Sequence, residues 1–345
     1  MAVQDMRKVK PLLELEDVSV IFERRQGLFS EPTKIGAVVD VNFGIYPGEV
    51  VALVGESGCG KTTLGNVVTG LQKPTHGKLS YNGVDLAKMN KQQLQEFRRG
   101  VQMVQQDSYA ALNPMRTIYQ SLSAPILQKK IVKKKDVFQR VCELLSTVEL
   151  NPPEQFLYKY PHQLSGGQRQ RVLMARAISL NPKIIVADEP VSMIDVSLRI
   201  SILNLMASLN KKMDIAFIYI THDLSTAKYI AQNGRIAVMY LGKLAEIGNV
   251  RQVLANPKHP YLQALLSAVP VPDPKVAKGN RSIPLKNFDM PSPANPPKGC
   301  RLHPRCPYAE ARCETVEPQL TRVDASEVAC HRASEIPAWN LVPAQ

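Results

Sequence analysis

Residues 55–62 read Gly55-Glu56-Ser57-Gly58-Cys59-Gly60-Lys61-Thr62, a glycine-rich stretch from which the fold class can be inferred. It fits the pattern G-x-x-x-x-G-K-[ST] and lies between an expected buried strand, Val50–Val54, and an expected helix that begins near Lys61. Glycines allow such a loop to turn tightly, so that its backbone N–H groups can point inward at phosphate oxygens, and the helix N-terminus adds its dipole. The stretch therefore predicts a site for the phosphates of a nucleotide.

The side chains of this phosphate loop add a cation and a metal ligand. The ammonium group of Lys61 can reach the β- and γ-phosphates, and the hydroxyl group of Thr62 can bind Mg²⁺. We expect the nucleotide to contact the whole loop and the residue after it, namely Gly55, Glu56, Ser57, Gly58, Cys59, Gly60, Lys61, Thr62 and Thr63.

Two carboxylates at the end of another apolar strand belong to the same predicted site. The apolar run Ile184–Ala187 is followed directly by Asp188 and Glu189. Because the carboxyl ends of parallel strands meet at one edge of a sheet, we expect both carboxylates beside the phosphate loop. Asp188 would hold Mg²⁺ through water, and Glu189 would polarise the attacking water. The pair therefore predicts nucleotide hydrolysis.

The remaining pattern predicts an α/β fold with a mainly parallel sheet. Residues 12–22 and 37–45 alternate apolar and polar side chains, which is typical of strands, and residues 215–220 form a further apolar strand. Helices are expected over residues 117–149 and from Ser165 onward. Strands that alternate with helices and are apolar throughout favour a sheet covered on both faces.

Composition excludes several classes of protein. Of the 345 residues, 44% are hydrophobic and 21% are charged, which argues against disorder, collagen or coiled coil as the main architecture. No apolar run approaches the roughly 20 residues that span a bilayer. Acidic residues at Glu14, Glu16 and Asp17 interrupt the apolar stretch near the N-terminus, so we expect no signal peptide and a cytoplasmic chain.

The net charge of +13 favours polyanionic partners without choosing among them. Five lysines occur among residues 129–135. We interpret this run as a solvated face, with contact to the anionic headgroups of a membrane surface as the alternative.

The stretch Leu164-Ser165-Gly166-Gly167-Gln168 precedes an expected helix and lies shortly before Asp188. Ser165 suits the N-cap of that helix, and two glycines expose backbone N–H groups beside it, which makes a second anion-binding helix terminus. The stretch resembles the LSGGQ signature of ATP-binding cassette (ABC) proteins. This resemblance implies an ABC ATPase: a P-loop NTPase with a RecA-like core, an antiparallel β subdomain and a helical subdomain at about residues 107–165, all within a nucleotide-binding domain spanning residues 1–269.

Other motifs of that family follow in the expected order. Gln106 resembles the Q-loop glutamine that touches Mg²⁺ and the transmembrane partner, and residues 192–195 resemble the D-loop. His222 resembles the switch histidine that contacts the γ-phosphate, and Phe22 the aromatic residue that stacks on adenine. The resemblance thus implies a catalytic set of Glu189, His222, Gln106 and Lys61, and Mg²⁺ ligands Thr62, Gln106 and Asp188. Two departures from close relatives are Gln105, where Phe is usual, and Ser108, where Pro is usual.

The family further implies a head-to-tail dimer. Each ATP then lies between the phosphate loop of one subunit and Ser165, Gly166, Gly167 and Gln168 of the other. All nucleotide motifs are intact, so we expect a competent ATPase.

Residues 256–261 and 265–270, together with a cysteine-bearing tail, resemble the ATP-binding subunits of bacterial oligopeptide and dipeptide importers. This resemblance implies a peripheral subunit on the cytoplasmic side of the inner membrane that hydrolyses ATP to power peptide import. Its expected partners are two transmembrane permease subunits, a second and different ATPase subunit, and an extracytoplasmic substrate-binding protein. Import of oligosaccharides or nickel is the alternative. Soluble ABC proteins of DNA repair or translation fit less well, because they usually carry two cassettes or a coiled-coil insertion, and we expect no nucleic acid partner.

Residues 270–345 are expected to form a C-terminal extension with a metal cluster, because Cys300, Cys306, Cys313 and Cys330 crowd into it. Structural zinc sites usually rest on tight C-x₂₋₄-C pairs, and none occurs among these four. The wider spacing suits a [4Fe–4S] cluster, and the family resemblance points the same way. We expect positive side chains around the thiolates, from Arg301, Arg305, Arg312 and His331. Zn²⁺, free thiols and disulfides remain alternatives.

Overall fold

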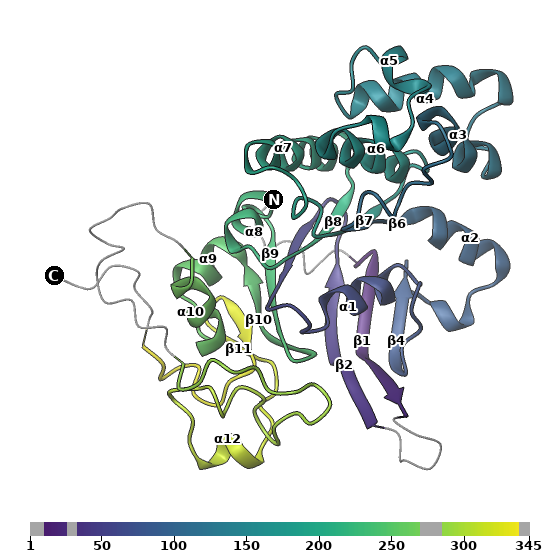
Figure 1. The fold of residues 1–345 in the computed structure, drawn as a ribbon. Coiled ribbons are helices and arrows are strands. Elements are labelled where there is room, and N and C mark those ends of the chain that lie inside the picture. The colour runs from purple at the N-terminus through teal and green to yellow at the C-terminus, as the bar shows by residue number, and fades with distance from the viewer. Residues whose placement is uncertain (1–9, 26–32, 270–284, 338–345) are drawn as a thin grey trace.

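An eight-stranded sheet forms the centre of the molecule, and a four-stranded sheet packs beside it (Figure 1). The structure is a computed structural model that describes residues 10–25, 33–269 and 285–337. The strand order is β11-β12-β10-β9-β3-β8-β7-β6 in the central sheet and β2-β1-β4-β5 in the smaller one.

The strands have the following bounds: β1 Leu13–Arg24, β2 Thr33–Ile45, β3 Val50–Val54, β4 His76–Tyr81, β5 Val84–Asp85, β6 Val101–Val104, β7 Ile184–Asp188, β8 Ala216–Thr221, β9 Arg235–Tyr240, β10 Lys243–Asn249, β11 Thr321–Val323 and β12 Ser326–Val328. The α-helices are α1 Lys61–Val68, α2 Lys91–Gly100, α3 Ile118–Gln128, α4 Val137–Thr147, α5 Glu154–Leu157, α6 Gly166–Ile178, α7 Val196–Met213, α8 Leu224–Ile230, α9 Val250–Ala255, α10 Pro260–Ser267 and α12 Ala311–Thr315. Short 3₁₀ turns lie at η2 Leu86–Lys88, η3 Lys134–Asp136 and η4 Pro161–Gln163. None of the helices in the described ranges is long and apolar enough to cross a membrane.

The middle of the central sheet is parallel, as the sequence predicts. Strand β3 pairs in parallel with β8 and β9, and β7 pairs in parallel with β6 and β8. Every residue of β3, β7 and β8 is buried, because both faces of the sheet are covered. That double burial is the physical reason why these strands are apolar throughout rather than alternating.

Successive side chains of these strands enter two different hydrophobic cores. Val51 and Leu53 of β3 pack into the core shared with α1 and the smaller sheet. Val50, Ala52 and Val54 pack into the core on the opposite face, which the helices α3, α4, α6 and α7 cover (Figure 1). Because side chains alternate between the two faces of each strand, the central sheet packs on one face against the antiparallel sheet and on the other against the helical layer.

The C-terminal residues extend the central sheet. Strand β12 pairs antiparallel with β10, with Glu246 opposite Val328, and β11 pairs antiparallel with β12. The described part of the tail, in yellow-green and yellow in Figure 1, thus lies against α10 and β10. The proline-rich connection at residues 270–284 lies outside the described residues, and the domain division at residue 269 stays a prediction.

Helix α1 approaches the central sheet closely at Gly65. A Cβ atom added there would lie 2.9 Å from Ile220 Cδ1 and 3.2 Å from Val186 Cγ1. We expect Gly65→Leu to lower the free energy of unfolding by about 1–3 kcal/mol, because extra methylene groups in a packed core force neighbouring atoms apart. Urea unfolding followed by circular dichroism measures the change. Gly65→Ala should lose less, and a Leu variant as stable as the wild type would contradict this account of the packing.

Candidate functional site

The phosphate loop between β3 and α1 depends on two glycines. Gly60 adopts φ 104°, and a Cβ atom there would lie 2.0 Å from the carbonyl oxygen of Ala37. At Gly55 a Cβ atom would lie 2.2 Å from the carbonyl oxygen of Met239. Only glycine fits such approaches, so the loop backbone lies directly against β2 and β9.

The loop borders a cavity of about 600 Å³ that is large enough for a nucleotide's phosphates. Most loop residues line the cavity, and Ala37, Gln106, Glu189, His222 and Leu265 complete its wall. The structure therefore brings the sequence-predicted loop, Gln106, Glu189 and His222 to one place. Several predicted site residues do not line it. The side chain of Cys59 is buried beneath the loop, Phe22 on β1 is 44% exposed elsewhere, and Asp188 and residues 165–168 are also outside its wall.

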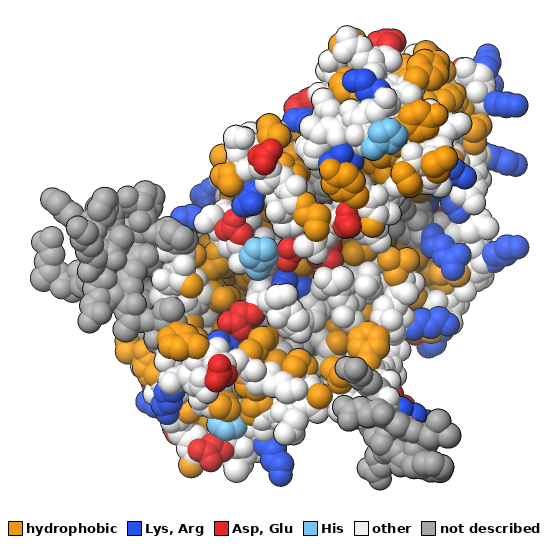
Figure 2. Space-filling model, in the orientation of Figure 1, with side chains coloured by type: hydrophobic (Ala, Val, Ile, Leu, Met, Phe, Trp, Pro, Cys, Tyr) orange, Lys and Arg blue, Asp and Glu red, His pale blue; other side chains and the backbone are white. Residues whose placement is uncertain are grey.

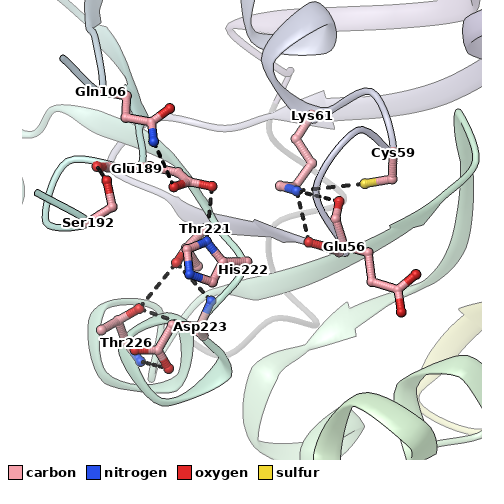
Figure 3. A network of polar contacts seen from close by, with 11 residues as sticks. Glu56, Cys59, Lys61, Gln106, Glu189, Ser192, Thr221, His222, Asp223 and Thr226 are labelled. Atoms are coloured by element: carbon pink, nitrogen blue, oxygen red, sulfur yellow. Dashed lines mark hydrogen bonds and ion pairs between the residues drawn. The ribbon is translucent and has the colours of Figure 1, made fainter. Parts of the chain in front are cut away.

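Lys61 occupies the centre of the loop. Its Nζ donates hydrogen bonds to the carbonyl oxygens of Gly55, at 2.8 Å, and Glu56, at 2.9 Å (Figure 3). The thiol of Cys59 lies 3.8 Å from the same Nζ, and burial raises the pKa of that thiol. The ammonium group is thus held where phosphate oxygens would arrive, beside a neutral thiol.

Glu189 is the centre of a second network across the cavity. Gln106 Nε2 donates to Glu189 Oε2 at 3.1 Å, and His222 Nδ1 lies 3.0 Å from Glu189 Oε1 (Figure 3). The hydroxyl of Ser192 donates to the Glu189 carbonyl oxygen at 2.9 Å. Three chain segments that follow β6, β7 and β8 therefore meet at one carboxylate. Glu189 has φ 43°, a left-handed conformation that is uncommon for a residue with a side chain and that occurs often at functional sites.

Asp188 has the properties of a ligand for Mg²⁺. It is 4% exposed, and its Oδ1 is buried without a hydrogen-bond partner among the described residues. Burial raises the pKa of the carboxyl group, and a hydrogen bond with Thr62 opposes that rise. A buried, unpaired carboxylate oxygen next to a threonine hydroxyl fits the oxygen ligands that Mg²⁺ prefers.

The LSGGQ stretch forms the capped start of α6, as predicted. The Gln168 N–H donates to Ser165 Oγ at 3.3 Å, and the Ser165 N–H donates to Gln168 Oε1 at 3.0 Å, which is a capping box. None of residues 165–168 lines the phosphate cavity of this chain. Within one subunit the two anion-binding termini therefore do not meet.

The cysteine-rich tail departs from the predictions. Among the described residues, no three or more His, Cys, Asp and Glu side chains are placed so that they could hold a metal ion. This finding counts against the zinc alternative and gives no support to the [4Fe–4S] cluster. The same four cysteines, Cys300, Cys306, Cys313 and Cys330, nevertheless line one small cavity.

The prediction that Arg301 and Arg305 surround the thiolates is wrong. Arg301 donates to the carbonyl oxygen of Leu241, and Arg305 forms an ion pair with Glu56 of the phosphate loop. Lys286 and Arg332 are instead the cationic side chains that lower the pKa of Cys306, against a larger increase caused by burial.

Sequence reasoning missed the residues that hold the phosphate loop from the C-terminal side. Tyr261 and Arg305 contact Glu56 from 205 and 249 residues away in the chain, and Leu265 of α10 lines the cavity. No local pattern marks these contacts, because tyrosine, leucine and arginine at such distances have no characteristic spacing to the loop.

Comparison with known proteins agrees with the geometry. The sequence model of the family described as ABC transporter matches residues 38–192, and that of the oligopeptide/dipeptide transporter C-terminal region matches residues 245–313. The oligopeptide transport ATP-binding protein AppF of Bacillus subtilis is 42% identical, with 93% of this chain and 97% of that protein covered. The oligopeptide transport ATP-binding protein OppF of Salmonella typhimurium is 41% identical, with 95% and 98% covered.

The chain therefore belongs to the family of ABC transporter ATP-binding proteins, and it is an ABC ATPase. Within that family, its relatives are oligopeptide and dipeptide transport ATP-binding proteins. A solved structure of the ATP-binding cassette MJ0796, dimeric and bound to ADP and Pi, superposes with a TM-score of 0.60 at 30% identity. That alignment covers 69% of this chain and 99% of the cassette.

The Glu189 network yields a direct test. We expect Glu189→Gln to bind ATP yet lose hydrolysis by roughly 100- to 10,000-fold, as for loss of a general base. Binding should survive because Lys61, Thr62 and Asp188 remain. Phosphate release and ATP titration of the purified protein measure both properties, and near-wild-type turnover would refute the assignment.

Proposed function

We propose that this chain powers the import of peptides by hydrolysing ATP for separate permease subunits at the cytoplasmic face of the membrane. The observation that carries the proposal is the placement of Glu189, between Gln106 and His222, across one cavity from Lys61. Similarity to peptide transport ATP-binding proteins over more than nine-tenths of the chain supports peptides as the transported solute.

In this proposal each polar group of the cavity has one task. Lys61 and the loop N–H groups bind the β- and γ-phosphates, and the exposed ring of Phe22, which lies outside the cavity wall, stacks on adenine. Thr62, Asp188 and Gln106 hold Mg²⁺, which neutralises charge on the phosphates when bound. Glu189 orients and polarises the attacking water, and His222 contacts the γ-phosphate.

The capped start of α6 serves the nucleotide of a partner subunit. Ser165 and Gly166 lie away from the phosphate cavity of their own chain, so a second cassette in a head-to-tail arrangement would complete each site. A second, different ATPase subunit is the expected partner. The dimeric state of the related cassette MJ0796 supports this arrangement.

The surface that follows Gln106 suits contact with a permease subunit. Tyr109 is 64% exposed and Met115 is 83% exposed, which leaves apolar side chains facing outward next to the Q-loop. Exposed lysines at Lys133, Lys134 and Lys135 provide positive charge on the same helical layer for anionic headgroups. Movement of Gln106 on ATP binding would then pass to the membrane subunits. An extracytoplasmic binding protein would select the solute.

Copurification with the permeases of the same gene cluster, followed by reconstitution into vesicles, tests the transport role. We expect vesicles with this chain on their inner face to take up a labelled oligopeptide only when ATP is enclosed in the vesicle lumen. If an oligosaccharide or nickel stimulates the ATPase activity and peptides do not, the transported solute is that compound and not a peptide.

Gly166 offers a test of the partner site. A Cβ atom there would meet nothing closer than 3.7 Å, so Gly166→Asp should leave the fold and ATP binding of the isolated subunit intact. In a closed dimer its carboxylate would oppose the γ-phosphate, and charges about 4 Å apart at an effective dielectric near 20 interact by roughly 4 kcal/mol. We expect transport to fail.

Gln95→Glu is the matched control, because it adds one negative charge on the exposed face of α2. This control variant should transport normally. Loss of ATP binding by an isolated Gly166→Asp subunit would contradict the assignment to the partner's nucleotide.

A second proposal concerns the four cysteines, which we propose as the ligands of a [4Fe–4S] cluster. It is supported by their convergence on one cavity, to which α12 contributes Cys313 and the irregular segments before and after α12 contribute the other three. Burial, together with the charges of neighbouring cysteines, raises the pKa of Cys300 to about 11 and that of Cys330 to about 12. The thiols therefore stay protonated at neutral pH unless a cationic group binds them. A cluster is wider than a single ion, so its ligands need not approach one point.

Anaerobic purification tests the cluster. We expect a brown protein with about four irons per chain. Cys306→Ser should lower the iron content, whereas Cys142→Ser on α4 should not. A colourless wild-type protein without iron would refute the proposal.

A further inference from the structure

Two residues of the C-terminal part of the chain form hydrogen bonds with Glu56 of the phosphate loop. The Glu56 carboxylate accepts hydrogen bonds from Arg305 Nη1 at 3.0 Å and Nη2 at 3.2 Å. The Glu56 N–H donates to the hydroxyl of Tyr261 at 2.8 Å. Figure 3 shows the Glu56 carboxylate pointing away from Lys61, out of the phosphate loop.

Arg305 is built into this position. It is 3% exposed, and its other donors bond the carbonyl oxygens of Asn287 and Phe288 and the hydroxyl of Tyr240. Together with the two bonds to Glu56, these acceptors account for all five N–H groups of a guanidinium. A bidentate pair with a fully satisfied arginine fixes its partner in direction as well as distance.

Tyr261 is held as firmly as Arg305. It is fully buried at the start of α10, and its ring packs on that of Tyr240 with centroids 4.6 Å apart. The Arg305 guanidinium also lies 5.7 Å from the Tyr240 ring centroid. Tyr240, at the end of β9, thus joins the two groups that reach Glu56.

Glu56 is also bonded from inside the loop. Its carbonyl oxygen accepts from Lys61 Nζ at 2.9 Å and from the Cys59 N–H at 3.3 Å. Displacement of Glu56 would therefore shift the groups that face the phosphates, although neither Arg305 nor Tyr261 lines the cavity.

We infer that Arg305 and Tyr261 are positioning residues for ATP binding, which act through Glu56 to hold the phosphate loop in its binding conformation. The inference rests on the proposed ATP site and adds a role for the C-terminal region in it. Because the loop is needed in ground state and transition state alike, loosening it should weaken nucleotide binding more than it slows turnover.

Equilibrium titration of the full-length chain with the non-hydrolysable analogue AMP-PNP and Mg²⁺ measures the first effect. We expect Arg305→Met and Glu56→Gln each to raise the dissociation constant about 10-fold, the scale of one charge-assisted interaction. The dissociation constant of the Arg305→Lys variant should lie between those of Arg305→Met and the wild type, because a single ammonium charge replaces a guanidinium that bonds to both carboxylate oxygens. Tyr261→Phe, which keeps the ring, should also weaken binding.

A double variant separates this role from a general structural one. If Arg305 acts through Glu56, Arg305→Met should add little in the Glu56→Gln background. In the reconstituted transporter the KM for ATP should rise while kcat stays within about 2-fold of wild type. Arg312→Met, which removes an exposed arginine of the same tail, is the matched control and should change neither.

Three results would overturn the inference. One is an Arg305→Met variant that binds AMP-PNP as the wild type does, even with a lower melting temperature. Another is a double variant in which the two losses of AMP-PNP affinity add together. The third is a lower kcat with an unchanged KM for ATP. A wild-type chain that binds no AMP-PNP would instead refute the proposed function itself.

Discussion

The close approach of the phosphate-loop backbone to its neighbours is the constraint on which the rest of the site depends. At Gly55 and Gly60 the loop lies so near the carbonyl oxygens of Met239 and Ala37 that no Cβ atom fits. The loop is thereby fixed against β9 and β2, and α1 must leave it in one direction. Lys61 then lies at the loop centre, and Thr62 lies beside Asp188 at the end of β7.

The parallel sheet brings the catalytic side chains together at one edge. Gln106, Glu189 and His222 follow three neighbouring strands, β6, β7 and β8, whose carboxyl ends share one edge. The hydrogen bonds from Gln106 and His222 orient the Glu189 carboxylate. The backbone of Glu189 adopts a left-handed conformation, and its N–H donates to the carbonyl oxygen of Ile220. A carboxylate fixed from both sides is oriented before any nucleotide arrives, which lowers the reorganisation needed for hydrolysis.

The C-terminal tail contacts the phosphate loop, although the tail itself carries none of the nucleotide motifs. Strand β12 adds to the central sheet at β10, and the turns between α10 and β11 place Arg305 against Glu56. Cys306 belongs to the same turn as Arg305, since the Cys306 N–H and the Arg305 N–H both donate to the Leu302 carbonyl oxygen. Arg301 and Arg305, which the sequence suggested as neighbours of the thiolates, contact Leu241 and Glu56 instead.

The phosphate loop, the strand of Val50–Val54, the Ser165 cap and the parallel sheet could all be predicted from the sequence, because each depends on contacts within a few residues or on the period of apolar side chains. The meeting of parallel strand ends placed Glu189 beside the phosphate loop, and the resemblance to ABC proteins added Gln106 and His222 to the same site. Two features became visible only in the folded chain: Tyr261 and Arg305 hold Glu56, and the four cysteines line a cavity without the arrangement of a single-ion site among the described residues. These features join residues more than 200 positions apart or depend on side-chain directions in irregular turns. No periodicity records such contacts, because packing of the completed fold alone brings them together.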